Sequence, residues 1–355
     1  MADTRETRIF AAAGHWTTNT GERFQGGLFR NSPGESRWQA LTAGLPDNVE
    51  ARALAVHPTE PDVIYVGTQD GPYRSIDSGA SWERLGFPVR GAVVWSLAFH
   101  PTRSEVMYAG LAPVGVYRSE DGGDSWRKLE GARSPEHCFM GPNFPTRTTR
   151  IAIDPGRPDD VYAALEVSGV IGSTDGGETW KDMSAPLIKL SDQPHLKSRI
   201  SSAIDAEGML DSHALAVSGG RAFLAVRMGL FQSDDRGESW RDMQIGRFSP
   251  LTYCRDVIVS PHDAHVMYAC LSPASRSHDG SLYRSNDAGQ SWHRFDHGVK
   301  ASATMMGAAV HPHKPERVYC VSRCGQVFGT EDDGSSWREY RLPQNVQDVY
   351  AVACA

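Results

Sequence analysis

The stretch Tyr73-Arg74-Ser75-Ile76-Asp77-Ser78-Gly79-Ala80-Ser81-Trp82 carries a pattern that recurs along the 355-residue chain. A Ser or Thr is followed by Asp after two positions, by Gly after four and by Trp after seven. Five more copies lie at Ser119 to Trp126, Ser173 to Trp180, Ser233 to Trp240, Ser285 to Trp292 and Thr330 to Trp337. A decayed copy without the Asp runs from Leu28 through Gly34 to Trp38. Such periodicity predicts an array of one repeated structural unit.

The residue types of this pattern suit a tight turn between two strands. Asp and Ser side chains accept hydrogen bonds from nearby backbone N–H groups, and Gly adopts a positive φ without steric cost. The Trp ring is large enough to fill the space between neighbouring sheets. We therefore expect each copy to be a structural clip and place no catalytic role on its Asp.

A second pattern precedes each copy and supplies two more strands. An alternating apolar segment ends in a turn, often His-Pro, and another segment with Tyr follows, as in Ala53 to Pro58 and Val63 to Gly67. Alternation of this kind is typical of strands. Related segments occur at Ser96 to Pro101, Ile151 to Pro155, Ala214 to Val226, Asp256 to Pro261 and Ala308 to Pro312. Each unit therefore has four strands, A to D, and the fold class is all-β.

The two ends of the chain complete one unit between them. The N-terminal segments Arg8 to Ala13, Gly27 to Arg30 and Trp38 to Leu41 match strands B, C and D, and Val346 to Cys354 matches the missing strand A. This sharing closes the ring and leaves no unpaired inner edge. The sequence predicts a single domain over residues 1–355, a seven-bladed β-propeller of four-stranded antiparallel blades.

Composition narrows the range of partners. The formal net charge is −7, and no dense run of Lys or Arg marks a nucleic-acid surface. No apolar run approaches the roughly 18 residues that cross a bilayer, and the first eight residues are polar and charged. We expect a soluble, cytoplasmic protein with no nucleic-acid or membrane partner. The six cysteines are scattered and are expected to be reduced thiols.

The six intact copies resemble the Asp box of the BNR propeller superfamily, which includes sialidases, xyloglucan-active glycoside hydrolases, sortilin-like receptors and photosystem II assembly factors. The resemblance covers the whole chain and implies the propeller fold, although this scaffold hosts both enzymes and binding proteins. The sialidase Arg-Ile-Pro motif is absent. The segment from His57 to Asp62, with Asp70-Gly71 and Tyr73-Arg74, is similar to the first blade of xyloglucan-active hydrolases. That similarity implies a catalytic carboxylate at Asp70, but those enzymes carry the second carboxylate on a second propeller, which has no counterpart in this sequence.

The irregular parts of the repeat point to one face of the ring. Strands alternate in direction, so B–C turns and D–A crossings share the face opposite the Asp boxes. Two crossings, 130–149 and 184–211, and two B–C loops, 14–26 and 272–280, are longer than the repeat requires. Binding sites concentrate on such loops, so we expect function on this face.

Non-repeating polar residues on this face are the candidate site residues. For substrate binding they are Arg52, Trp95, Arg150, Arg227, Arg255, Arg323 and Trp16. For catalysis they are His213, Glu166, Asp70 and Tyr253, with Glu166 or Asp256 as the expected acid–base partner of His213. Several arginines at one opening favour an anionic ligand such as a carboxylate or phosphate.

Four histidines on the same face raise the alternative of a divalent metal, zinc, manganese or iron. They are His15, His137, His195 and His213. Three imidazoles with an open position are typical of catalytic metal sites.

The sequence is compatible with two functions. The first is a hydrolase or lyase that binds a small polar or anionic substrate, such as a carbohydrate derivative, at the channel mouth. The second is a non-catalytic propeller that binds another protein or assists assembly. Its expected contacts are apolar residues of the long crossings: Phe139, Met140, Phe144, Leu187, Ile188 and Leu190.

Overall fold

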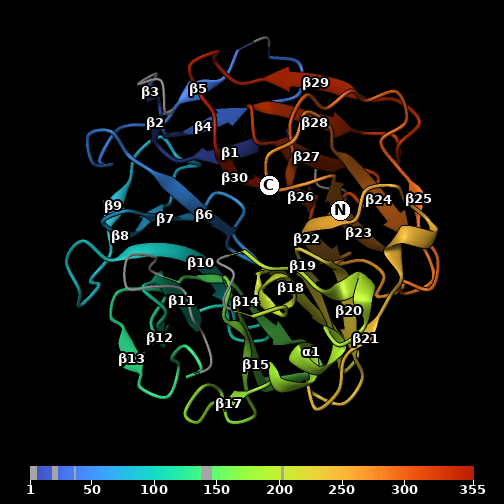
Figure 1. Ribbon diagram of the computed structural model, residues 1–355. Helices are drawn as coiled ribbons and strands as arrows, with labels where there is room; N and C mark the ends of the chain where they lie inside the picture. Colours follow the sequence, from blue (N-terminus) through green and yellow to red (C-terminus); the bar gives the residue numbers. More distant parts are fainter. Residues whose placement is uncertain (1–5, 18–22, 36, 137–145, 201–203) are drawn as a thin grey trace.

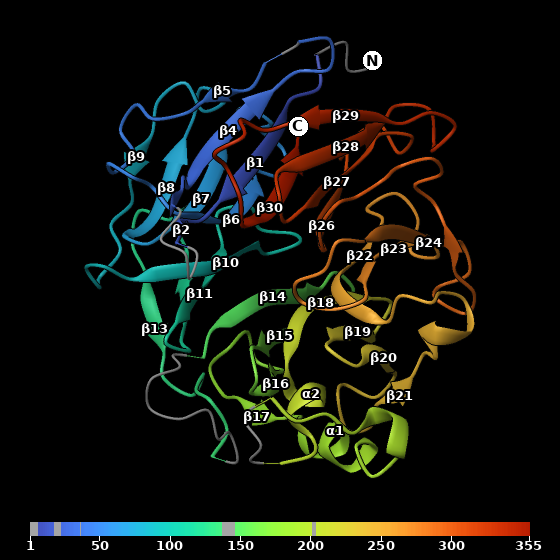
Figure 2. The ribbon, with the colours of Figure 1, turned by 45° about the horizontal axis from the view of Figure 1, so that its top comes forward.

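Seven four-stranded antiparallel sheets stand around a central axis, as predicted (Figure 1; Figure 2). The structure is a computed structural model that describes residues 6–17, 23–35, 37–136, 146–200 and 204–355. The inner strands are β6 (Ala51–Val56), β10 (Val93–Phe99), β14 (Thr148–Asp154), β18 (Ser212–Ser218), β22 (Tyr253–Val259), β26 (Met305–Val310) and β30 (Val349–Cys354). The second strands are β7 (Ile64–Thr68), β11 (Met107–Ala112), β15 (Arg157–Leu165), β19 (Arg221–Val226), β23 (Met267–Ser272), β27 (Val318–Ser322) and β1 (Ile9–Ala13).

The outer half of each blade is the hairpin that carries the Asp box. Its third strands are β8 (Gly71–Ser75), β12 (Val116–Ser119), β16 (Gly169–Ser173), β20 (Gly229–Ser233), β24 (Ser281–Ser285), β28 (Gln326–Thr330) and β4 (Gly27–Asn31). The short outermost strands are β9 (Glu83–Arg84), β13 (Arg127–Leu129), β17 (Lys181–Asp182), β21 (Arg241–Asp242), β25 (His293–Arg294), β29 (Arg338–Arg341) and β5 (Gln39–Ala40). A small separate hairpin pairs β2 (Trp16–Thr17) with β3 (Arg23–Phe24).

The two ends of the chain close the ring in one blade, ordered β30-β1-β4-β5. Ile9 pairs with Cys354 and Ala12 with Ala351. Beyond the strands, the backbone N–H groups of Arg8 and Ala355 each donate to the other residue's carbonyl, at 2.9 and 3.0 Å. The closing pairing is therefore antiparallel and continues to the last residue, as the sequence predicted.

The Asp boxes close their hairpins through a fixed set of hydrogen bonds. In the copy after β16, the Ser173 hydroxyl donates to Asp175 Oδ1 at 2.7 Å and accepts from Gly177 N at 2.8 Å. Thr179 donates to the same carboxylate from its backbone N at 2.9 Å and from its hydroxyl at 2.6 Å. Trp180 Nε1 donates to the carbonyl of Gly177 at 2.8 Å. Gly177 has φ 96°, which explains the Gly of the pattern.

Tyrosines of the second strands tie neighbouring blades together. The Tyr65 hydroxyl donates to Gly122 O at 2.9 Å, and the Tyr108 hydroxyl donates to Gly176 O at 3.0 Å, each in the next blade's Asp box. The equivalent Tyr319 faces the decayed box, and its buried hydroxyl finds no partner in the described part of the chain. This boundary between blades thus lacks the hydrogen bond that Tyr65 and Tyr108 make, worth about 1 kcal/mol.

The long crossing between β17 and β18 folds into short helices: α1 (Ala185–Leu190), the 3-10 turn η1 (Pro194–Leu196) and α2 (Glu207–Leu210). A second 3-10 turn, η2 (Ile245–Arg247), follows β21. The prediction of an exposed apolar surface on this crossing is wrong for Leu187, which is fully buried with Leu196 and Met209 against the blade. Burial of its apolar face holds the crossing on the ring. Phe139, Met140 and Phe144 lie outside the described residues.

In the described part of the chain, no helix has the length and apolar character needed to span a membrane.

The Asp boxes predict a specific loss of stability in acid. Hydrogen bonds from Thr179, with that from Ser173, lower the pKa of Asp175 from its ordinary 3.8 to about 2. The unfolded chain has the ordinary value, so this stabilisation is present above about pH 4 and is lost as the pH falls toward 2. Because the carboxylate is exposed, we expect Asp175→Asn to cost only about 1 kcal/mol at pH 7, and the difference from the wild type should disappear near pH 2.

Urea unfolding at both pH values measures this effect. Asp192→Asn is the matched control, since Asp192 is exposed and lies outside the boxes. An Asp175→Asn variant as stable as the wild type at pH 7, or equally destabilised at both pH values, would contradict the assignment.

Candidate functional site

A β-bulge interrupts the start of every inner strand. In β6, for example, Ala51 pairs with Thr68 and Ala53 with Gly67, so Arg52 is the extra residue. The seven extra residues are Arg52, Trp95, Thr149, His213, Arg255, Met306 and Tyr350. A bulge redirects the side chain of its extra residue, and bulges are frequent next to active sites.

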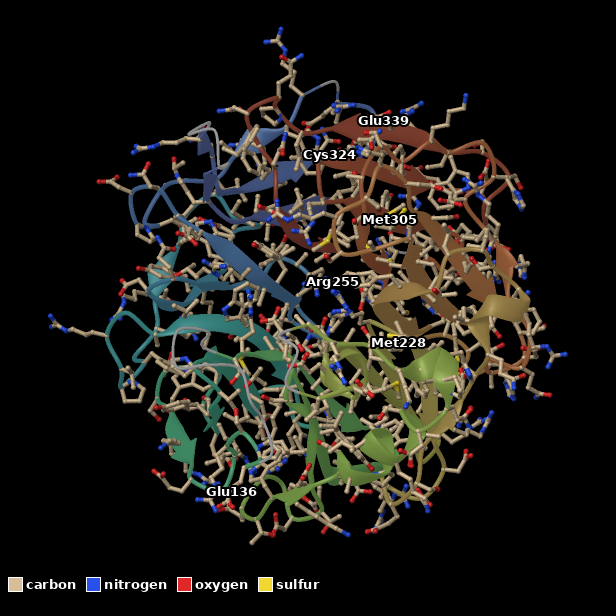
Figure 3. The ribbon with its side chains drawn as sticks, in the orientation of Figure 1. Glu136, Met228, Arg255, Met305, Cys324 and Glu339 are labelled. Carbon is tan, nitrogen blue, oxygen red and sulfur yellow. The ribbon has the colours of Figure 1, made fainter. Side chains whose placement is uncertain are left out.

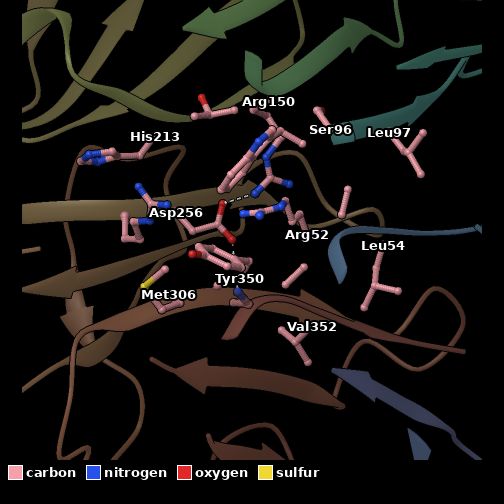
Figure 4. Close-up of a pocket in the computed structure, with 17 residues that line it drawn as sticks. Arg52, Leu54, Ser96, Leu97, Arg150, His213, Asp256, Met306, Tyr350 and Val352 are labelled. Carbon is pink, nitrogen blue, oxygen red and sulfur yellow. Dashed lines mark hydrogen bonds and ion pairs between the residues drawn. The ribbon is translucent and has the colours of Figure 1, made fainter. Parts of the chain in front are cut away.

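All seven bulge residues line one hollow at the axis of the ring (Figure 4). Its free volume is about 90 Å³, and its wall continues along the inner strands through Arg150, Asp256 and the small residues Gly307 and Ala308. This space holds a few waters or one small ion but not a sugar chain. The mouth of the channel is therefore where the repeat presents seven side chains of six different types.

Arg150 and Asp256 bridge the hollow from different blades. Arg150 Nη2 lies 2.7 Å from Asp256 Oδ1, and the backbone N–H of Ala308 donates to Asp256 Oδ2 at 3.1 Å. The side chain of Asp256 is 4% exposed, whereas that of Arg150 is 40% exposed. Both carboxylate oxygens of Asp256 thus have a partner within the protein. Arg150 is partly exposed and has N–H donors that face the channel.

An aromatic and cationic cluster forms the opposite wall. The guanidinium carbons of Arg52 and Arg147 lie 4.4 and 4.1 Å from the centroid of Trp95, and Tyr350 meets Trp95 edge to face at 5.2 Å. Cation–π contacts of this kind fix arginines while leaving their edge donors available. Tyr350 and Arg147 were not predicted, because Tyr350 reads as an ordinary strand residue and Arg147 belongs to an irregular crossing.

Arg255 is the bulge residue of β22 and places a guanidinium in the mouth. Its side chain is partly exposed in the hollow, near the axis of the ring in Figure 3, and no described residue lies within hydrogen-bond or ion-pair distance of its guanidinium. Burial works to lower the pKa of Arg255, but Tyr253, Glu166 and Asp211 outweigh it and raise the pKa above its usual value. A charged, partly desolvated guanidinium with free donors is an anion-binding group.

Two further arginines surround the same point. Arg323 pairs with the buried Asp348 at 2.7 Å, and burial together with the charge of Arg255 lowers its pKa. Arg227 makes no side-chain hydrogen bond or ion pair with the residues that the structure describes, although its backbone N–H donates to Asp211 O at 3.2 Å. Burial raises the pKa of Tyr253, while the charges of Arg255, Arg323 and Arg227 oppose that rise. The phenol therefore lies within the field of all three arginines.

Tyr253 belongs to a buried network with His213 and Asp211. His213 Nδ1 lies 2.7 Å from the carbonyl oxygen of Cys254, and Nε2 lies 3.1 Å from the Tyr253 hydroxyl and 3.3 Å from Asp211 Oδ2. Burial raises the pKa of Asp211, but His213, Arg255 and Arg227 bring it below the ordinary value, so Asp211 is ionised. A carbonyl oxygen only accepts, so Nδ1 donates to Cys254 O. Nε2 lies between the Tyr253 hydroxyl and Asp211 Oδ2, so the network fixes the position of the phenol.

Each carboxylate around the mouth, in the described part of the chain, has a cationic partner. The pairs are Glu50 with Arg52, Glu166 with Arg147, Asp211 with His213, Asp256 with Arg150 and Asp348 with Arg323. The expected pairing of His213 with Glu166 or Asp256 is wrong: the carboxylate that contacts the ring is Asp211. Asp211 was missed because it ends an irregular crossing, where no strand pattern places it.

Two other predicted residues lie elsewhere. Asp70, in the turn between β7 and β8, pairs with Arg84 at 3.2 Å and accepts from the Tyr73 hydroxyl at 3.3 Å, and it does not line the hollow. Trp16 lies in β2, and its side chain is not among those described.

The predicted histidine metal cluster is not assembled by the described residues, in which no group of three His, Cys, Asp or Glu side chains is placed to hold a metal ion. His15 Nδ1 accepts from Gly26 N at 3.2 Å, and His195 pairs with Asp242 at 3.5 Å. His213 is held by its own network, and His137 lies outside the described residues. His15, His195 and His213, the described members of the predicted set, thus have separate partners.

Comparisons with known proteins agree with this architecture. The family model described as sortilin, neurotensin receptor 3, matches residues 280–353. Xyloglucanase Xgh74A of Acetivibrio thermocellus is 23% identical over 320 residues, 75% of this chain and 35% of that protein. The chain thus spans about a third of the length of this relative.

Solved structures reproduce the fold. A GH74 xyloglucanase from Xanthomonas campestris superimposes with a TM-score of 0.62 at 17% identity, over 97% of this chain and 54% of that one. The chain fits the Asp-box propeller superfamily. A structure of YCF48 bound to D1 peptide superimposes with a TM-score of 0.53 at 14% identity, over 83% and 82% of the two chains. The relatives similar in sequence are xyloglucanases, and the likeness to solved structures shows the propeller fold.

The unpaired guanidinium predicts that small anions stabilise this Asp-box propeller. Sulfate at about 100 times its Kd should add about 2.7 kcal/mol to the free energy of unfolding and raise Tm by several degrees. We expect Arg255→Gln to lose most of this rise.

Thermal unfolding in sulfate and in chloride at equal ionic strength measures the effect. Arg90→Gln, at an exposed position in a crossing, reports the general salt effect. If the sulfate response of Arg255→Gln equals that of the wild type, Arg255 is not the anion site.

Proposed function

We propose that this propeller binds the anionic group of a small carbohydrate-derived substrate at the channel mouth and cleaves that substrate as a hydrolase or lyase. The observation that carries the proposal is the unpaired, partly exposed guanidinium of Arg255, with Arg227 and Arg323 close by. Arg255 has no direct ion-pair partner among the described residues, and a bound carboxylate supplies one. The substrate's anionic group is thus the element that the mouth recognises.

The network behind Arg255 supports acid–base chemistry beside the bound anion. Burial raises the pKa of Tyr253, which keeps its phenol protonated at neutral pH, and His213 and Asp211 fix its orientation. In this proposal Tyr253 donates a proton to the leaving oxygen as the C–O bond breaks. In hydrolysis a water oxygen bonds to the anomeric carbon and the proton that this water releases returns to the tyrosinate. In elimination the tyrosinate takes up the proton removed from the neighbouring carbon as the alkene forms. His213 acts as a positioning residue.

The engaged carboxylates argue against the usual pair of acid and nucleophile. Two free carboxyl groups about 5 to 10 Å apart serve most glycoside hydrolases. Around this mouth each described carboxylate is ion-paired, and Asp70 lies away from the hollow. The proposal therefore assigns the acidic role to Tyr253 and leaves the distinction between hydrolysis and elimination to product analysis.

A second candidate is a non-catalytic propeller that binds a protein. The similarity in fold to YCF48 bound to D1 peptide favours it, since arginines at a channel mouth also suit the carboxylates of a peptide. On this alternative Arg255 binds a carboxylate of the partner protein, and no substrate is converted.

Turnover of acidic oligosaccharides separates the two candidates. Wild-type protein should cleave members of a panel of uronate-containing oligosaccharides, and Tyr253→Phe should lower the rate about 10²- to 10⁴-fold because the proton donor is removed. New reducing ends without an alkene indicate hydrolysis, and an unsaturated uronate, seen by its ultraviolet absorbance, indicates elimination.

Tyr340→Phe is the matched control, a buried tyrosine of the outer strand β29. Binding of the same oligosaccharides without cleavage would favour the protein-binding alternative. Cleavage of neutral xyloglucan oligosaccharides in preference to acidic ones would contradict the anionic substrate.

A further inference from the structure

A second hollow, which we call the side cleft, lies between η1 and η2. Its free volume is about 480 Å³, within the range of small-molecule sites. The side cleft shares no lining residue with the channel mouth. In Figure 3, Met228 of the cleft lies farther from the axis of the ring than Arg255 of the mouth. The side cleft is thus a separate space, and the proposed function does not use it.

Two arginines line the side cleft without an ion-pair partner among the described residues. Arg227 lies in the turn between β19 and β20, and its guanidinium makes no hydrogen bond or ion pair with that part of the chain. Arg247 lies in η2 and is exposed, and its Nη1 donates to the neutral Gln244 Oε1 at 3.1 Å. Both guanidinium groups therefore have N–H donors left for a ligand.

The charges of the lining favour an anion with a single negative charge. Asp242 is the acidic residue of the lining; its Oδ1 accepts from Gln244 N at 2.7 Å, and its Oδ2 lies 3.5 Å from His195 Nε2. Both carboxylate oxygens thus have partners within the protein. With a neutral imidazole, two guanidinium groups and one carboxylate leave the lining with a net charge of +1. A monoanion balances this charge, whereas a second negative charge on the ligand is repelled by Asp242.

The other part of the lining offers apolar surface. Leu196 and Ile245 are buried at the cleft, and Met228 is partly exposed there. Thr252 adds a methyl group, and the arginine side chains add their methylene stems. The flexible thioether of Met228 adapts to ligands of different shape. An apolar ligand chain that covers this surface gains affinity in proportion to the area removed from water.

We propose that the side cleft binds a small carboxylic acid with an apolar chain. The carboxylate pairs with Arg227 and Arg247, whose fork-shaped donors suit its two oxygens, and the chain packs against Met228. This site goes beyond the proposed function, since it uses neither Arg255 nor the hollow at the axis. The propeller therefore has two anion sites on one face, with different ligands.

Calorimetry with three probes tests the combination of charge and apolar surface. Hexanoate carries both features, acetate carries the charge alone, and 1-hexanol carries the chain alone. Hexanoate should bind wild-type protein about tenfold or more tightly than either of the other two, because only hexanoate uses both parts of the lining.

Three variants locate the site. Arg227→Gln and Arg247→Gln should each weaken hexanoate binding about tenfold, because each removes a charged hydrogen-bond donor. Gly246→Phe fills the side cleft without changing its charge and should abolish binding. A Cβ at Gly246 meets only Thr252 Cγ2, at 3.6 Å, so the chain accommodates this change.

Two controls separate this site from the mouth and from general charge effects. Arg255→Gln should leave the hexanoate Kd within about twofold of the wild type while losing the sulfate response of the mouth. Arg90→Gln, at an exposed position that lines neither hollow, should also leave the Kd within about twofold.

Four results would overturn the proposal. The first is an absence of saturable hexanoate binding up to about 10 mM, and the second is equal affinity for hexanoate and 1-hexanol. The third is a loss of hexanoate affinity in Arg90→Gln as large as in the two cleft arginine variants. The fourth is loss of binding in Arg255→Gln with retention in Gly246→Phe, which would place the acid at the mouth. A failure of the side cleft leaves the sulfate response of Arg255, and with it the proposed function, unaffected.

Discussion

The backbone pairing between β1 and β30 is the constraint on which the rest of the structure depends. It joins the first and last segments of the chain in one sheet, so that the seven inner strands surround a closed channel. Without this pairing β30 would have no strand partner, and the blade of β1, β4 and β5 would lack its inner strand. With the ring closed, residues from all seven blades face one axis, and the mouth of the channel is built from segments as distant as Arg52 and Tyr350.

The repeated β-bulge places one side chain from each blade at the channel mouth, and these side chains form the candidate site. The same backbone irregularity recurs at seven positions, but the residues that it presents differ from blade to blade, from Thr149 and Met306 to Arg255. On the opposite face, the Asp boxes and the A–B turns repeat one set of hydrogen bonds, and this repetition stabilises the blades. His57 and His100 illustrate that structural use, as their Nδ1 atoms accept from Glu60 N and Arg103 N and close the A–B turns. The stabilising turns and the proposed binding site therefore lie on opposite faces of the ring.

The fold was predictable from sequence because its signals are local. An Asp box needs only nearby side chains, and the strand alternation and the split blade at the termini are visible along the chain. At the mouth, Arg52, Trp95, His213 and Arg255 were also predicted, because each is an odd residue at the start of an inner strand.

The contacts within the site could not be predicted. Which arginine is left unpaired depends on carboxylates brought from other blades, as Arg150 shows by its pairing with Asp256. A bulge shifts strand alternation by one residue, which hid Tyr350, and Asp211 ends a crossing whose path is set by burial of Leu187. The expected histidine metal site also failed on this point, since a shared face does not bring His15, His195 and His213 together.

The central claim is that the channel mouth is an anion site built around an unpaired Arg255. A crystal structure of the wild-type protein with selenate tests it directly, because selenium is located by anomalous scattering without reference to the surrounding protein. The account predicts an anomalous peak within hydrogen-bond distance of the Arg255 guanidinium, with the Arg150–Asp256 pair intact. Selenate bound only at other surfaces, with Arg255 ion-paired to a carboxylate of the protein, would contradict it.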